Sequence, residues 1–273
     1  MLVDAHVHIW SDNAVRYPWR QTLAHVPIPT RAATAEDLLT EMDSARVSHA
    51  VLVQPSVYGG DNSYLCDSLN RWSDRFVGIC HVPPDTQNAR RDLEYWCGER
   101  GCQAVRVNII RQADPSWLLA PEQETFWRTI ESSSLSVSMH MELDHAPLLV
   151  ALAERYPHTT FLVEYLGAQV YRGGNHAPIL DRLASLPNIL FKLICAAEDS
   201  QGPYPFADII AFYTAVLARF GVRRVVLGSD FPGVRSVCAY ADAMGWLQKF
   251  PQLSDADRRQ VLGGTPARIW RFR

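Results

Sequence analysis

The sequence lacks the features that direct a protein to a membrane or a nucleic acid. It contains no apolar run long enough to cross a bilayer, and its N-terminus lacks the basic flank and long apolar segment of a signal peptide. It has no basic run, and its formal net charge is only −3, so nothing points to a nucleic-acid groove or a membrane-surface patch. We therefore expect a small-molecule partner, and no nucleic-acid or membrane partner.

Paired cysteines are also missing. The six cysteines are scattered, none forms a Cys-x-x-Cys pair, and several lie in apolar runs, as buried free thiols do. This distribution favours a reduced, cytoplasmic setting over a disulfide framework. The residues are Cys66, Cys80, Cys97, Cys102, Cys195 and Cys238.

A glycine-rich fingerprint is absent after the first strand pattern, which argues against an open dinucleotide-binding sheet. The chain has instead eight short apolar runs that alternate with amphipathic helical patterns, without a linker between them. Such alternation predicts a parallel sheet covered by helices. Eight units predict one α/β domain over 1–273, a single (β/α)₈ TIM barrel, and an open doubly wound sheet is the alternative.

The expected elements follow from these patterns. The strand patterns cover 2–9, 49–54, 75–80, 103–109, 135–143, 159–165, 188–194 and 222–228. A first helix begins after the N-cap Thr34. The later helical patterns cover 61–72, 88–100, 121–132, 146–155, 176–186, 206–220, 237–250 and 254–262.

Two histidines, His6 and His8, sit one residue apart in the first strand pattern. Side chains at positions i and i+2 of a strand point to the same face, so the two imidazoles are aimed at one spot. Neutral imidazole is the commonest metal ligand at physiological pH. The alternative is a pair of chance histidines on one polar face.

Polar side chains recur where the other apolar strands meet their loops. In a TIM barrel these C-terminal strand ends form the active site, and packing alone gives no reason for polar residues there. They are Gln54, Ser56, Tyr58, Arg106, Asn108, His140, Glu142, Glu164, Tyr165, Lys192, Ser229 and Asp230.

Four of the candidate residues form a set of metal-binding type: His6, His8, His140 and Asp230. Three imidazoles and a carboxylate suit zinc or a similar divalent ion with an open position for water. Asp230 could instead take a proton from water as a general base. The alternatives are a buried core histidine for His140 and a turn residue for Asp230.

Arg106 lies between two valines in a strand that is largely buried, and a guanidinium there needs an anionic partner. That partner is either a substrate carboxylate or an internal carboxylate, which Glu142, Glu164 or Asp230 would supply. Arg235 lies in a strand-end loop and could assist. Five other histidines fall in loops or helix starts and receive no role: His25, His81, His145, His158 and His176.

These patterns resemble the amidohydrolase superfamily, and within it the amidohydrolase-2 branch that contains the metal-independent 2-pyrone-4,6-dicarboxylate lactonase and related sugar lactonases. The resemblance runs from residue 2 to about residue 271. The similar stretches are Val-Asp-Ala-His-Val-His-Ile-Trp, Val-Leu-Val-Gln-Pro-Ser-Val-Tyr-Gly-Gly-Asp-Asn, Arg-Phe-Val-Gly-Ile, Ala-Val-Arg-Val-Asn, Gly-Ser-Asp-Phe-Pro and Gly-Gly-Thr-Pro-Ala-Arg-Ile-Trp-Arg.

The resemblance implies a distorted (β/α)₈ barrel that hydrolyses a lactone, commonly one that carries carboxylates. Asp230 would activate water, His6 and His8 would polarise the scissile carbonyl directly or through a metal, and Arg106 would bind a carboxylate. One divalent metal, with zinc preferred, is the implied cofactor, and metal-independent activity is the alternative. Further substrate contacts are expected from Gln54, Ser56, Tyr58, Asn62 and Arg235.

One position departs from the pattern of this branch. Tyr165 stands where a histidine of the catalytic cluster is expected. A tyrosine donates a hydrogen bond to a carbonyl, but its pKa of about 10 makes it a poor base at neutral pH. Tyr165 is therefore expected to donate to the developing oxyanion, or to mark changed chemistry. The alternative functions are a metal-dependent non-oxidative decarboxylase, which His140 favours, and a silent barrel that binds a ligand without turning it over.

Overall fold

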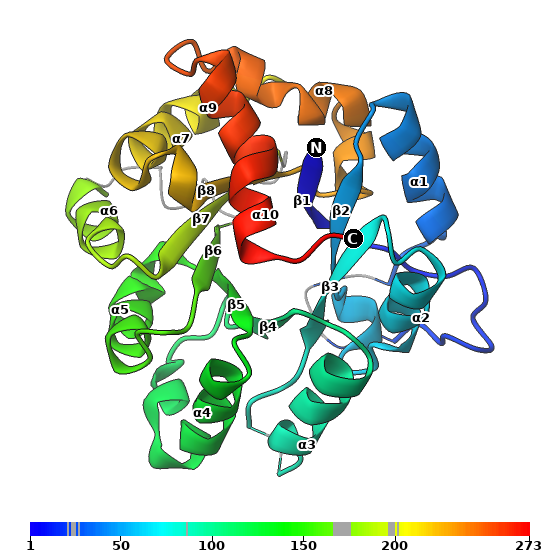
Figure 1. The fold of residues 1–273 in the computed structure, drawn as a ribbon, viewed down its shortest axis with the longest axis vertical. Coiled ribbons are helices and arrows are strands. Elements are labelled where there is room, and N and C mark those ends of the chain that lie inside the picture. The colour runs from blue at the N-terminus through cyan, green and yellow to red at the C-terminus, as the bar shows by residue number, and fades with distance from the viewer. Residues whose placement is uncertain are drawn as a thin grey trace.

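The computed structural model describes residues 1–20, 22, 26, 28–85, 87–165, 176–195, 200 and 202–273, without the side chain of residue 165. Within this part of the chain, eight strands form one parallel sheet in chain order, with the helices arranged around them (Figure 1). The predicted (β/α)₈ barrel is therefore confirmed. The strands are β1 (Val3–Val7), β2 (His49–Val53), β3 (Phe76–His81), β4 (Ala104–Asn108), β5 (Ser136–Met141), β6 (Phe161–Tyr165), β7 (Ile189–Ile194) and β8 (Val225–Gly228).

The first nine helices follow the predicted order with different ends, and a tenth, over Thr265–Ile269, lies beyond the last predicted stretch. The first begins with the predicted cap, because Thr34 and Asp37 bond to each other's backbone N–H. The pattern over 88–100 is α-helical for its first part and continues as a π-helical segment, Glu94–Glu99. The helices are α1 (Ala35–Ser44), α2 (Ser63–Arg71), α3 (Ala89–Leu93), α4 (Glu124–Ser132), α5 (Ala146–Arg155), α6 (Ala177–Ala184), α7 (Ala207–Phe220), α8 (Tyr240–Met244), α9 (Asp255–Arg259) and α10 (Thr265–Ile269).

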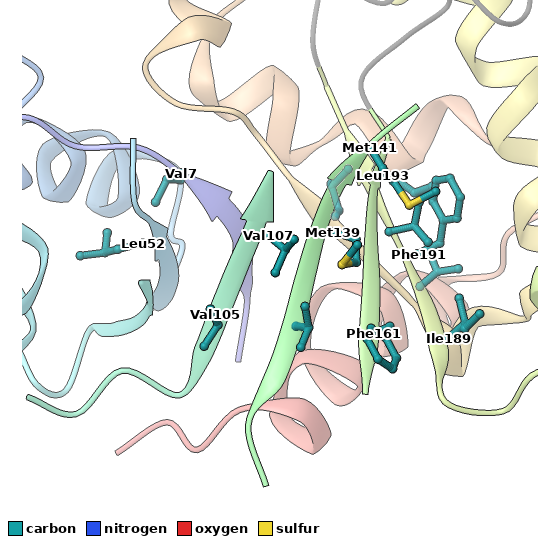
Figure 2. Packing of buried hydrophobic residues seen from close by; sticks show 14 of the residues in the cluster. Val7, Leu52, Val105, Val107, Met139, Met141, Phe161, Ile189, Phe191 and Leu193 are labelled. Carbon is teal, nitrogen blue, oxygen red and sulfur yellow. The ribbon is translucent and has the colours of Figure 1, made fainter. Parts of the chain in front are cut away.

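Apolar side chains form two layers, one inside the barrel and one between the strands and the helices. Successive side chains of a strand point to opposite faces, so Leu162 and Leu190 belong to the inner layer, whereas Phe161 and Phe191 belong to the outer one (Figure 2). Burial of these layers is the main source of stability. By the same alternation, the next inward-facing residues of β6 and β7 are Glu164 and Lys192, closer to the C-terminal ends of the strands.

The opposite end of the barrel is closed by the C-terminal segment. Helix α10 crosses this end in Figure 1, and the Trp270 side chain lies within the inner apolar layer. Its indole N–H donates to the Ser136 hydroxyl at 3.3 Å. A Cβ on Gly263 would lie 2.6 Å from the carbonyl oxygen of Met1, so glycine lets this segment lie against the N-terminus. No described helix is both long enough and apolar enough to span a membrane.

Candidate active site

A β-bulge in β1 determines which side chains enter the barrel. Between Asp4 and Val7, β1 uses one residue more than β2, which is the signature of a bulge. Ala5 consequently belongs to the inner apolar layer, whereas Val7 belongs to the outer one. The extra residue allows His6 to point inwards directly after Ala5.

Strands β1 and β8 meet closely at the level of His6. A Cβ on Gly228 would lie 2.3 Å from the Cβ of His6, so only glycine fits at this position. The Asp4 carboxylate accepts hydrogen bonds from the backbone N–H groups of His6, at 3.2 Å, and Ser229, at 2.9 Å. Burial raises the pKa of Asp4 to about 6. These contacts fix the ends of the two strands relative to each other.

The two predicted histidines face each other through their Nε2 atoms, which are 3.1 Å apart. His8 Nδ1 lies 2.7 Å from the carbonyl oxygen of Val53. A carbonyl oxygen only accepts hydrogen bonds, so His8 carries a proton on Nδ1 and presents a lone pair at Nε2 in its neutral form. Burial lowers the pKa of His6 to about 4 and also lowers that of His8, which keeps both rings in the neutral form that binds metals.

Asp230 reaches the histidine pair from the end of β8. Its backbone has a left-handed conformation, with φ at 60°, which costs a non-glycine residue about 1 kcal/mol or more. Its N–H donates to the His6 carbonyl at 3.0 Å, which holds the backbone in place. A Cβ on Gly233 would lie 2.7 Å from Asp230 Oδ2, so glycine leaves room for the carboxylate.

The three side chains have the geometry of a divalent-cation site. Asp230 Oδ1 lies 3.8 Å from Nε2 of both His6 and His8, and in the described part of the chain these residues form a cluster with all ligand atoms within 4.8 Å of one another. Zinc binds such atoms at about 2.0–2.2 Å, so atoms up to about 4 Å apart can share one ion. Two neutral imidazoles and a carboxylate are also a donor set that zinc prefers.

A buried ionic cluster lies next to the histidine pair. Glu164 on β6 bonds to Arg106 Nε at 3.0 Å and to Lys192 Nζ at 2.8 Å, and it accepts a hydrogen bond from Ser138. Burial by itself would raise the pKa of Glu164, but Lys192 and Arg106 hold it well below its usual range. Burial also lowers the pKa of Lys192, against the opposing effect of Glu164. The cluster reaches the metal-type site through His6 Nδ1, which is 3.5 Å from Glu164.

A cavity of about 380 Å³ opens beside this cluster. Residues at the C-terminal ends of β2, β3 and β4, and in the loops that follow, line it. Arg106 lines it and is only 6% exposed. The other polar residues that line it include Gln54, Ser56, His81 and Asn108. A partly buried guanidinium at the wall of a cavity can bind an anion strongly, because little water competes there.

The structure gives several predicted site residues other partners. The Tyr58 hydroxyl accepts from the Ser11 N–H at 2.8 Å, and Asn62 bonds to both backbone groups of His81. Arg235 forms an ion pair with Glu41 of α1. Gln54 lines the cavity, but its amide donates to the carbonyl groups of the loop that follows.

Two further predictions stay open. His140 lies on the same face of β5 as Ser138 and pairs in register with Glu164, but it is not part of the cluster formed by His6, His8 and Asp230. Its role as a fourth ligand stays a prediction. The side chain of Tyr165, at the end of β6, lies outside the described residues, so its catalytic role stays a prediction too.

The sequence named Glu164 only as one of three possible partners of Arg106, and the structure selects it. Lys192 was noted as a polar strand-end residue but received no role, and neither did His81. Glu164 and Lys192 are inner-layer positions, two residues after Leu162 and Leu190, and a charge at such a position was the available signal. His81 ends β3 and lines the cavity. The predicted strand stopped one residue short of it, which hid its place at the barrel mouth.

The family of the chain follows from a comparison along its whole length. A family model described as amidohydrolase matches residues 3–272. The chain belongs to the amidohydrolase family. Two curated relatives of this amidohydrolase are lactone hydrolases. The L-fucono-1,5-lactonase of Burkholderia ambifaria is 25% identical over 99% of this chain and 95% of that protein. The 4-sulfomuconolactone hydrolase of Rhizobium radiobacter is 28% identical over 84% of this chain and 75% of that protein.

Solved structures share the fold of this amidohydrolase. A Pseudomonas putida protein described as a 2-pyrone-4,6-dicarboxylic acid hydrolase superposes with a TM-score of 0.81 at 23% identity, over 98% of this chain and 96% of that chain. An amidohydrolase from Burkholderia multivorans, crystallised with bound zinc, has a TM-score of 0.77 at 19% identity, over 98% of both chains.

Proposed function

We propose that this amidohydrolase opens a small cyclic ester that carries a carboxylate. The observation that carries the proposal is the cluster of His6, His8 and Asp230 at the barrel mouth, joined through Glu164 to a guanidinium that lines a cavity. The names of the two relatives support a lactone as the substrate. The volume of the cavity, about 380 Å³, suits a monocyclic compound.

Arg106 is the proposed carboxylate-binding residue. Its Nε donates to Glu164, and its Nη1 lies 3.4 Å from the carbonyl oxygen of Gln54. A guanidinium has further N–H groups beyond these two, and those on the cavity side can bind a substrate carboxylate. Because Arg106 and His6 contact the same carboxylate of Glu164, the bound carboxylate and the scissile carbonyl must belong to a compact substrate.

We also propose that His6, His8 and Asp230 hold one divalent cation, with zinc preferred and His140 as a possible further ligand. A bound divalent cation supplies a Lewis acid for the carbonyl and lowers the pKa of water. The donor set and its spacing support this proposal, as does the zinc in the structure from Burkholderia multivorans.

The chain's own residues then perform the proton transfers. Asp230 takes a proton from the water that attacks the carbonyl carbon, and returns it to the ring oxygen when the C–O bond breaks. His6 and His8 would hold the cation that polarises the carbonyl, and the carboxylate bound to Arg106 fixes the ring in the orientation for attack. The product is the open-chain hydroxy acid.

The decisive experiment measures hydrolysis of a panel of lactones with and without carboxylates. Carboxylated lactones should be turned over, and Asp230→Asn should lower kcat roughly 10²–10⁴-fold with an unchanged circular dichroism spectrum. Chelation followed by zinc addition tests the cation separately. Full activity in Asp230→Asn would refute the mechanism, decarboxylation without lactone hydrolysis would favour the alternative enzyme, and binding without turnover would indicate a silent barrel.

A further inference from the structure

Two buried groups of opposite charge face the same nitrogen of His6. Lys192 Nζ and Glu164 Oε1 each lie 3.5 Å from His6 Nδ1, and they lie 2.8 Å from each other. All three residues are fully buried. An ammonium group can only donate to that nitrogen, whereas a carboxylate can only accept from it. The pair therefore fits either tautomer of the neutral His6 ring.

The other nitrogen of the ring decides which tautomer is needed. His8 presents a lone pair at Nε2, because its Nδ1–H is taken by the Val53 carbonyl, and this lone pair lies 3.1 Å from His6 Nε2. Without a cation, His6 must place its proton on Nε2 and donate it to His8. With a cation between the rings, both Nε2 atoms must offer lone pairs, so the proton of His6 must be on Nδ1.

We propose that the Lys192–Glu164 pair acts as a tautomer switch for His6. In the metal-free protein Lys192 donates to the bare Nδ1, and in the metal-bound protein Glu164 accepts from Nδ1–H. Both are positioning residues that act through His6. This inference rests on the proposed metal centre. A carboxylate or carbonyl that accepts from the second nitrogen of a ligating histidine changes metal affinity roughly 10–100-fold. Here Glu164 is that acceptor, and Lys192 is a competing donor that lowers the affinity instead.

Single substitutions should therefore move the affinity for zinc in opposite directions. Lys192→Met removes the donor and keeps the apolar stem, so it should tighten zinc binding roughly tenfold. Glu164→Gln removes the charged acceptor and should weaken zinc binding by roughly tenfold or more. The measurement is competition between the metal-free protein and a chromophoric zinc chelator. A purely structural role of the pair predicts weaker binding in both variants.

Nitrogen-15 NMR of the histidine rings gives a readout that does not depend on affinity. The proton of His6 should be on Nε2 in the metal-free wild type, on Nδ1 after zinc is added, and on Nδ1 without zinc in Lys192→Met. If Glu164→Gln does not fold, the double variant Glu164→Gln/Lys192→Met, which keeps the wild-type net charge, should bind zinc more weakly than Lys192→Met.

The outcomes separate this inference from the proposed function. Unchanged or weaker zinc binding in Lys192→Met, with the ring proton still on Nε2, overturns the switch and leaves the metal centre intact. A wild-type protein that binds no zinc overturns both the switch and the metal centre.

Discussion

Replacing Gly228 with alanine should push β8 away from β1 at the level of the candidate metal ligands. The added Cβ would lie 2.3 Å from His6 Cβ and 2.9 Å from the His6 backbone nitrogen, whereas ordinary contacts of this kind begin at 3.4 Å. The first separation is too short by 1.1 Å, the difference of these values. Because a backbone atom is involved, a change of rotamer cannot relieve the clash.

The energetic cost has two parts. Overpacking in a well-packed interior costs about 1–3 kcal/mol. A shift of about this size also strains the hydrogen bonds from Asp230 N–H to the His6 carbonyl, at 3.0 Å, and from Ser229 N–H to Asp4, at 2.9 Å. Each such bond contributes about 0.5–1.5 kcal/mol. The free energy of unfolding should fall by about 2–6 kcal/mol in total, and zinc affinity should fall with it.

Urea-induced unfolding, followed by circular dichroism, measures this effect. Gly98→Ala is the matched control, because a Cβ there has no heavy atom outside its own helix within 4 Å. It should leave the free energy of unfolding unchanged or raise it by up to about 1 kcal/mol, since alanine favours a helix over glycine. If Gly228→Ala is as stable as Gly98→Ala and binds zinc like the wild type, the argument from close approach is wrong.

Two further predictions concern charge. Burial raises the pKa of Asp4 from 3.8 to about 6. At a pH between these two values, the Asp4 carboxyl is protonated in the folded protein and ionised in the unfolded chain. The folded protein therefore becomes more stable as the pH falls through this range. From pH 7 to pH 4, the free energy of unfolding of the metal-free wild type should therefore rise by up to about 3 kcal/mol relative to that of Asp4→Asn, as measured by urea unfolding. If the difference in stability between the two proteins does not change with pH, the pKa of Asp4 is not raised. Arg106→Gln should raise KM for a carboxylated lactone roughly tenfold or more, since it removes charge-assisted bonds worth about 1.5–3 kcal/mol. Arg235→Gln, which breaks an ion pair with Glu41, should leave KM within about twofold in the same steady-state assay, and equal effects of the two variants would refute the proposed role of Arg106.

The alternation of short apolar runs with amphipathic helical patterns predicted the barrel, and the two-residue period of a strand predicted the pairing of His6 with His8. Strand periodicity is a local property of the backbone, so the order of eight strands and helices can be read along the chain. The placement of Asp230 at the end of the eighth strand followed from the same reading. The bulge in β1 had no signal of its own, because it is a shift in the register between β1 and β2, which no single segment of the chain shows.

The partners of the charged side chains could not be predicted from these local patterns. The sequence left Arg106 between a substrate carboxylate and three internal ones, and the structure pairs it with Glu164, 58 positions away. It likewise brings Lys192 to His6 across 186 positions, and it pairs Arg235 with Glu41 of α1.

The sequence by itself thus determined the barrel and the end of it where the candidate site lies, because both follow from local periodicity and from where each strand stops. Only the tertiary structure decided which charges meet. Inside a closed barrel, every strand end is close to several others, and the choice among them depends on bulges, strand register and burial, which belong to no single segment of the chain.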